Sequence, residues 1–350
     1  MYGGDSGRNK PGDIPYLGVR KELVLTAKPT LDEEVLLYLY RFITRRYKVH
    51  IKKDIQGLPA PWTKDPVIQN YRFTNVRREH DKETRWLIQN IANNPNVTYE
   101  DKLLNCVLFR LYNKHETSEL ISQPIPFTHI IEKNGVWDPD SYRALFAAQD
   151  CIDPERVFFT GVFMVSGLLR IANQYTPGGK GEEDTRMRPL WLLRHLVDLH
   201  LPDRIKRCKT AREVCRVLSR IDGIGVFLGY QMFVDMTYIP EFPFSENEYV
   251  VAGRGCQRGC EYLFEDSDDM TYEECIFWLR DHLEDIFAEH TKGKFSCKTL
   301  FSDLPPYDQQ FNVMSIENCL CELSKYTRVL RKEGRPRKRY QGGQDEKDKK

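Results

Sequence analysis

Residues 210–236 read TAREVCRVLSRIDGIGVFLGYQMFVDM, and this stretch decides the fold. Thr210 and Glu213 have the spacing of a capping box, which predicts a helix start. Apolar residues at positions 214, 217, 218 and 221 recur at helical spacing, so they predict a short amphipathic helix. A turn with Gly223 and Gly225 follows, and the apolar run after it predicts a second helix. We interpret the segment as two helices joined by a glycine hairpin.

A hairpin of this kind is suited to holding a phosphate of the DNA backbone. Gly223 and Gly225 allow backbone amides to face outward at the start of a helix, where partial positive charge attracts phosphate. We predict that both glycines contact the DNA backbone, together with Arg220 and with Arg254 in a later glycine turn. The alternatives are a plain turn between two helices and, for Arg220, a solvated cation at a helix end.

The composition is that of a folded, mainly α-helical protein. The chain has 350 residues, 41% of them hydrophobic and 12% aromatic, and its net charge is +1. This length allows one large domain or two packed lobes. We expect residues 1–15 to be disordered and residues 16–330 to form a helical domain, with lobes at about 16–200 and 201–330. Residues 331–350 read as a basic, charged tail without ordered structure.

Several classes of site and location are not indicated. The ten cysteines contain no pair with the two-residue gap of a zinc knuckle, and no two histidines are four residues apart, so we expect no metal. Gly178-Gly179-Lys180 lacks the P-loop pattern, and we expect no cofactor. No apolar run approaches the roughly 20 residues that span a bilayer. We expect no membrane partner and no secretion, with a nuclear location in a eukaryote and a cytoplasmic one otherwise.

Caps and apolar spacing predict the other helices. Thr30, Thr98 and Thr271 each precede an acid by three residues and are predicted to begin helices. Residues 158–171 are apolar nearly throughout, which fits a strand or a helix. The predicted helices cover residues 31–47, 79–91, 99–114, 141–149, 190–200, 255–264, 271–290 and 316–330.

Four further blocks accompany the hairpin, at residues 71–82, 108–114, 227–236 with 248–259, and 316–326 with 334–340. Together they resemble the α-glutamyl/putrescinyl-thymine pyrophosphorylase family, whose module also forms the helical domain of phage-type 5-hydroxymethyl-deoxyuridine DNA kinases. The resemblance covers residues 65–340 and implies a helix-hairpin-helix, DNA-glycosylase-like helical bundle. In those kinases a P-loop domain precedes the module, so this chain resembles the stand-alone helical enzyme.

The resemblance implies thymine hypermodification, in which a phosphate on 5-hydroxymethyluracil in DNA is displaced by an amine. The implied partners are double-stranded DNA with a flipped modified pyrimidine and a small amine or amino acid as co-substrate. A DNA glycosylase and a non-catalytic DNA-binding or chromatin-binding helical module are the alternatives. The family's turn usually has Asp and Gly-Pro-Gly, whereas this chain has Glu248 and Gly253-Arg254-Gly255.

Glu248 and Asp235 are the first predicted catalytic residues. Glu248 lies in the polar turn where the glycosylase fold keeps its catalytic acid, and a surface acid beside Glu246 is the alternative. Asp235 follows Gln231 by one helical turn, so both share one helix face. We predict that Gln231 binds the base through its amide, while the alternative is that this pair caps backbone groups.

The remaining predicted site residues come from the other blocks. Arg78 is expected to bind the substrate phosphate with catalytic Asp81 holding it, and a plain surface ion pair is the alternative. Asn75 is expected beside them at the substrate. Asn113 is predicted to bind the base, or else to cap a helix C-terminus. Lys325 is predicted to reach a phosphate, or else to pair with a glutamate one turn away.

Overall fold

The computed structural model describes residues 29–122, 139–160, 166–176, 181–265 and 270–334. These residues form helices and connecting turns, and their isolated β-bridge joins Leu31 to Phe264. The mainly α prediction is therefore confirmed for the described part of the chain. Residues 1–15 and most of the 331–350 tail lie outside it. No described helix is both long enough and apolar enough to cross a membrane.

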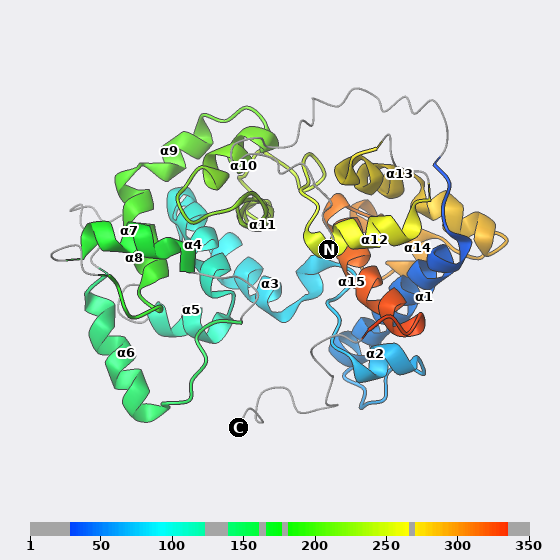
Figure 1. Cartoon of the computed structure of the whole chain (residues 1–350), viewed down its shortest axis with the longest axis horizontal. Coiled ribbons are helices and arrows are strands. Elements are labelled where there is room, and N and C mark those ends of the chain that lie inside the picture. The colour runs from blue at the N-terminus through cyan, green and yellow to red at the C-terminus, as the bar shows by residue number, and fades with distance from the viewer. Residues whose placement is uncertain (1–28, 123–138, 161–165, 177–180, 266–269, 335–350) are drawn as a thin grey trace, which may run out of the picture.

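The first and last helices of the described chain pack together. This group lies on the right of Figure 1, where α1 and α12 both contact α15. Short π turns and 3-10 turns connect these helices. The group consists of α1 (Glu33–His50), η1 (Ile51–Ile55), α2 (Pro66–Asn70), α12 (Arg254–Leu263), α13 (Tyr272–His290), α14 (Cys297–Leu300), η7 (Pro306–Asp308) and α15 (Val313–Leu330).

The middle of the chain forms the second group, on the left of Figure 1. Helix α4 is its centre, because it is buried on all sides and contacts α8, α9 and α11. Helices from both sides of residue 200 therefore pack together. The group consists of η2 (Arg78–His80), α3 (Lys82–Leu87), η3 (Ile88–Ala92), α4 (Tyr99–Tyr112), α5 (His115–Ile121), α6 (Ser141–Ile152), η5 (Ser166–Leu168), α7 (Leu169–Tyr175), α8 (Arg188–Asp198), α9 (Leu201–Lys206), α10 (Ala211–Ser219) and α11 (Val226–Met236).

Close helix packing fixes the position of α12 on α15. A Cβ atom at Gly259 would overlap the carbonyl oxygen of Leu320, so only glycine allows this approach. One buried apolar cluster runs through both groups of helices. The two groups therefore share a continuous core, and α12 brings its N-terminus next to the second group.

Three of the predicted N-caps are confirmed. Thr98 caps α4, and Thr271 with Glu274 forms the full capping box of α13. Thr210 caps α10, although the carboxylate of Glu213 accepts from the N–H of Lys209 at 2.6 Å instead of closing the box.

Two local predictions are wrong. Asp32 caps α1 instead of Thr30, because Thr30 is extended and its carbonyl accepts the N–H of Glu265 at 3.0 Å. The helix predicted over residues 79–91 is divided into a 3-10 turn, the short α3 and a π turn. Residues 158–160 are neither helix nor strand, and residues 166–171 are helical.

Candidate functional site

The predicted hairpin lies at the surface between α10 and α11. Its buried residues Ile221 and Ile224 hold it in place, and Ile224 N–H donates to the Ile221 carbonyl at 2.9 Å. Gly223 has a φ of +80°, and a Cβ there would also overlap the backbone of Gly167. Gly225 is the N-cap of α11 and faces open space. The start of α11 is therefore exposed, while Gly223 is required for the turn and its packing.

A second helix start lies next to the first. The ring of Phe227, in the first turn of α11, packs against Gly253, which is the N-cap of α12. Arg220 and Arg254 are both exposed at these turns. We call Arg220, Gly225, Phe227, Gly253 and Arg254 the glycine-turn surface. Two helix N-termini and two arginines give this surface a positive potential that suits an anion.

A buried cluster of polar side chains connects η2 with α4 and α11. Arg78 donates through Nη1 to Gln231 Oε1 and through Nη2 to Asp235 Oδ1, the latter at 3.1 Å. Arg110 of α4 donates from Nε to the other oxygen of Asp235 at 2.6 Å. Asp235 is fully buried. Its carboxylate is thus occupied by two guanidinium groups, and we call these four residues the arginine–aspartate cluster.

Asp235 stabilises the charges of both arginines in this cluster, whereas the charge of Arg78 disfavours that of Arg110. Burial alone lowers the pKa of Arg78, but the carboxylate of Asp235 outweighs it and raises that pKa. Burial and the charge of Arg78 together lower the pKa of Arg110 despite its bonds to Asp235. Removing one member of such a buried group leaves another charge without compensation, which costs several kcal/mol. Arg78 shares its carboxylate partner, so its charge is only partly neutralised.

Two glutamic acids near the cluster titrate close to neutral pH. Burial and the charge of Glu79 raise the pKa of Glu246 to about 8, although Arg77 and Arg78 oppose the shift. Burial raises the pKa of Glu317 to about 7, and its Oε1 accepts the N–H of Gly253 at 3.1 Å. Carboxylic acids with such pKa values are suited to proton transfer in this pH range.

Polar atoms without partners surround Arg78. Gln231 Nε2, Tyr238 Oη, Glu246 Oε2 and Glu79 Oε2 are shielded from solvent and have no hydrogen-bond partner among the residues that the structure describes. Tyr238 and Glu246 both interact electrostatically with Arg78. Buried polar atoms are nearly always paired, so a cluster of unpaired ones indicates a place for ordered water, an ion or a ligand. We call these four atoms the unpaired polar set.

The predicted acid Glu248 lies outside this set. It is exposed, and its Oε1 accepts the N–H of Ser245 at 2.6 Å within a local turn. Glu246 is the shielded acid of this turn, and Asn312 at the start of α15 donates to its Oε1. Within the turn that the sequence selected, the acid that faces the interior is therefore two residues earlier than the predicted one.

The predicted link between Arg78 and Asp81 is wrong. Asp81 Oδ1 accepts from the backbone N–H and the side-chain amide of Asn75, both at 3.0 Å, whereas Arg78 reaches across to α11. Burial raises the pKa of Asp81 to about 6, against the hydrogen bonds from Asn75. Asn75 and Asp81 therefore form their own local unit, and Asp235 takes the place of Asp81 beside Arg78.

Asn113 and Lys325 occupy structural positions. Asn113 is the left-handed C-cap of α4, with a φ of 52°, and its side chain accepts from Arg110 at 2.7 Å. Lys325 pairs with Glu322 and lies over the ring of Phe73 at 5.6 Å. Both positions match the alternatives of a helix cap and a structural ion pair.

Five residues of the site were not identified from the sequence: Glu79, Arg110, Tyr238, Glu246 and Glu317. A signal existed for Arg110, because a lone arginine within the apolar run of α4 indicates a buried and paired cation. Glu246 and Glu317 gave no such signal. Their burial places them in the site, and the sequence does not show which acids of a turn or helix are buried.

Comparison with known proteins identifies the family of the chain. The sequence matches the protein family described as 5-hmdU DNA kinase, helical domain, over residues 33–335. A 5-hmdU DNA kinase of Bacillus phage SP10 is 26% identical over 332 residues, which cover 90% of this chain and 48% of the phage protein. The chain thus spans about half the length of that relative, and no solved structure shows significant similarity. Because the family match extends over most of the described residues, the chain belongs to the family of the 5-hmdU DNA kinase helical domain.

Proposed function

We propose that this chain modifies 5-hydroxymethyluracil, or its phosphate or pyrophosphate ester, in DNA and displaces the phosphate with an amine. Membership of the helical-domain family supports an enzyme that acts on hydroxymethylated uracil in DNA. The phage relative is named for its action on 5-hmdU DNA, which supports the same class of substrate. The amine and the displacement step come from the resemblance to the thymine pyrophosphorylases.

The unpaired polar set is the observation that carries this proposal. A uracil edge presents an acceptor, a donor and an acceptor, so its recognition needs donors and an acceptor in a dry site. Gln231 Nε2 is a donor, and the hydroxyl of Tyr238 can donate and accept. Arg78 binds the Gln231 oxygen and thereby leaves the amide nitrogen for the base. A flipped uracil would satisfy atoms that the described chain leaves unpaired.

The acids supply the proton transfers of the displacement. The amine nitrogen attacks the methylene carbon on C5, the bond from that carbon to the phosphate oxygen breaks, and the phosphate leaves with the electron pair. Glu246, protonated at neutral pH, donates a proton to the leaving oxygen, and Arg78 stabilises the negative charge of the leaving phosphate. Glu317, with a pKa of about 7, accepts the proton that the amine loses.

The glycine-turn surface positions the DNA for this reaction. Its two helix N-termini and the exposed Arg220 and Arg254 bind backbone phosphates on either side of the flipped nucleotide. Glu317 accepts from Gly253 of this surface, so the backbone contacts and the acid are coupled. In this proposal Glu246 replaces Glu248 as the acid, and Asp235 positions Arg78 and Arg110 instead of acting as a catalyst.

Mass spectrometry of digested oligonucleotides tests this function. The purified chain is incubated with duplexes that carry thymine, 5-hydroxymethyluracil or its phosphate esters, with and without amines. We expect a new base adduct and release of phosphate or pyrophosphate from an ester substrate. Glu246→Gln should abolish the adduct, whereas the exposed control Glu248→Gln should retain it.

Other results of this experiment would indicate a different function. Abasic sites in place of adducts would indicate a glycosylase. If the wild type and Glu246→Gln both bind the duplexes and neither changes them chemically, the chain is a non-catalytic binding module. A chain that binds none of the duplexes at moderate salt would contradict a role on DNA.

A further inference from the structure

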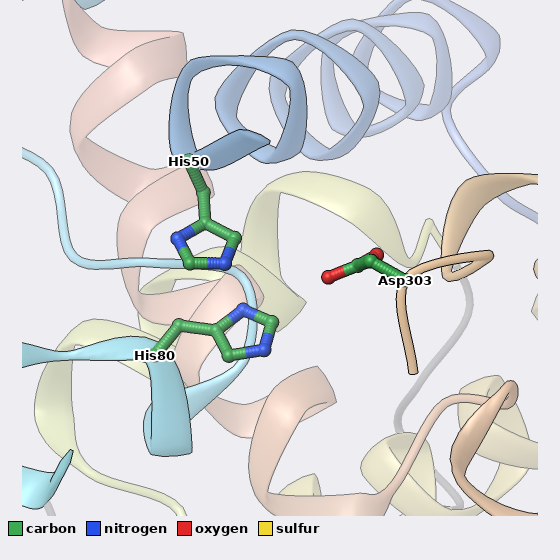
Figure 2. A group of neighbouring side chains, drawn as sticks. All are labelled: His50, His80 and Asp303. Atoms are coloured by element: carbon green, nitrogen blue, oxygen red, sulfur yellow. The ribbon is translucent and has the colours of Figure 1, made fainter. Parts of the chain in front are cut away.

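Two histidines and an aspartate that are far apart in the sequence meet at one place. His50 is the last residue of α1, His80 ends η2, and Asp303 lies in the turn after α14. Figure 2 shows the two imidazole rings one above the other, with the Asp303 carboxylate directed toward them. One potential ligand atom from each residue lies within 4.8 Å of the other two. We call these residues the two-histidine site.

The ring nitrogens that face this site have no partner. His50 Nε2 and His80 Nδ1 are shielded from solvent and make no hydrogen bond to any residue in the described ranges. Both side chains are more than nine-tenths buried, with exposures of 2% and 8%. The rings stack at 3.9 Å with an angle of 13° between them. Burying two unpaired nitrogens side by side is unfavourable unless a ligand satisfies both.

The surroundings prepare His50 to act as a metal ligand. Its Nδ1 lies 2.9 Å from Asp54 Oδ2, so this nitrogen carries the proton that the carboxylate accepts. The lone pair is then on Nε2, which faces the site. A carboxylate behind a histidine in this way fixes the tautomer and the ring orientation of many metal ligands.

The other two residues are also suited to a cation. His80 presents Nδ1 to the site, and this shielded nitrogen makes no hydrogen bond to any described residue. Tyr47 donates its hydroxyl to Asp303 Oδ1 at 2.7 Å, which orients the carboxylate and leaves Oδ2 available. Asp303 is exposed, so the site is open to solvent on this side.

We propose that His50 Nε2, His80 Nδ1 and a carboxylate oxygen of Asp303 bind one divalent first-row transition-metal ion, with water completing the coordination. Two imidazoles and one carboxylate with an open position are a common set for Zn²⁺. Ligand bonds of about 2.1 Å require the three atoms to move closer and the two rings to tilt until their lone pairs converge. The ion joins the end of α1, η2 and the turn after α14.

The metal would also fix the segment that carries Arg78. His80 is two residues after Arg78, and its carbonyl accepts from the side-chain amide of Asn75 at 2.9 Å. Holding His80 therefore limits the motion of η2 relative to the end of α1 and the turn after α14. This role is separate from the proposed chemistry, because it concerns the stability of the fold and not a step of the reaction.

A second group of potential ligands provides a matched control. His115 lies between Glu83 and Glu116, and its two ring nitrogens are each 3.1 Å from a carboxylate oxygen. These nitrogens have protein partners, so the group lacks the feature that indicates a metal at the two-histidine site. Replacing His115 should leave metal binding unchanged.

The test measures metal binding by the full chain after chelator treatment. Titration with Zn²⁺ should show one equivalent bound, and Co²⁺ should give the visible absorption of a nitrogen- and oxygen-ligated ion. His50→Gln and Asp303→Asn should each weaken Zn²⁺ binding more than the roughly 10–100-fold expected for an outer-shell residue. Circular dichroism verifies that each variant is folded, and if His50→Gln unfolds, the exposed Asp303→Asn decides.

Three results would overturn the proposal. The first is a wild-type chain that binds no Zn²⁺ or Co²⁺ at micromolar concentration. The second is an Asp303→Asn variant that binds as tightly as the wild type. The third is bound Co²⁺ with strong thiolate charge-transfer absorption, which would place the ion on some of the ten free cysteines.

Discussion

Replacing Glu246 by glutamine should remove much of the pH dependence of stability between about pH 5 and pH 8. The Oε2 of Glu246 is shielded from solvent, and the pKa of the group is raised from an ordinary 4.5 to about 8. The folded state therefore binds this proton more tightly than the unfolded state. Its stabilising contribution is complete below the unfolded pKa and is lost as the pH rises through the folded pKa.

The size of the effect follows from the shift. One pKa unit corresponds to about 1.4 kcal/mol. Between pH 5 and pH 8 the unfolded chain has released the proton and the folded chain retains it, so stability falls by about 4 kcal/mol from this group. Glu317 and Asp81 have pKa values raised in the same direction. The difference between variant and wild type measures Glu246 together with the nearby Glu79, whose charge raises its pKa.

Urea unfolding, followed by the helical circular-dichroism signal at several pH values, measures this difference. The free energy of unfolding of Glu246→Gln should fall less steeply with pH than that of the wild type, by about 4 kcal/mol over the interval. The matched variant Glu248→Gln changes an exposed acid and should follow the wild-type slope. Parallel curves for Glu246→Gln and the wild type would refute a buried, protonated Glu246.

Three further substitutions test the packing of the fold by urea unfolding. Asp235→Asn leaves two buried guanidinium groups without their shared carboxylate and should destabilise the chain by about 3–5 kcal/mol, so a loss below about 1 kcal/mol would contradict the buried cluster. Gly259→Ala forces a methyl group into the Leu320 carbonyl and should cost about 1–3 kcal/mol or more, and a neutral result would mean that α12 and α15 are farther apart. Thr271→Ala removes half of a capping box and should cost about 1 kcal/mol, unless that helix start is not formed in solution.

Local signals allowed most helices to be predicted. The caps of α4 and α13 depend on residues three positions apart, and the apolar spacing of α10 lies within one helix. Thr30 failed as a cap because its backbone pairs with a segment more than 230 residues away, at Glu265. The interruption at Asp81, between η2 and α3, likewise has no signal in the spacing of apolar residues.

The site could be predicted only in part. Arg78, Gln231 and Asp235 were selected as individual residues, but their hydrogen bonds join positions about 150 residues apart, which spacing cannot reveal. Arg78 was therefore paired with its near neighbour Asp81. The choice between Glu246 and Glu248 depends on which side of a turn faces α15, and that is decided by packing.

The residues of the two-histidine site also could not be grouped from the sequence. His50 and His80 are 30 residues apart and Asp303 lies more than 200 residues further on, so no ligand spacing announces them. The absence of a histidine pair on one helix face therefore excluded only metal sites that form within a single helix. Sites assembled from the end of α1, η2 and a distant turn require the fold.

The most direct test of the central claim uses Tyr238→Phe and three duplexes. These carry thymine, 5-hydroxymethyluracil or its phosphate ester at one position. The substitution removes a shielded hydroxyl without a partner in the described chain, so it should leave stability unchanged or raise it. Fluorescence anisotropy should show that the wild type binds the phosphate ester of 5-hydroxymethyluracil more tightly than thymine, and that Tyr238→Phe weakens binding of the ester duplex about tenfold. Equal binding of all three duplexes by the wild type, or an unchanged affinity of Tyr238→Phe for the ester duplex, would contradict the claim that these unpaired atoms bind the modified base.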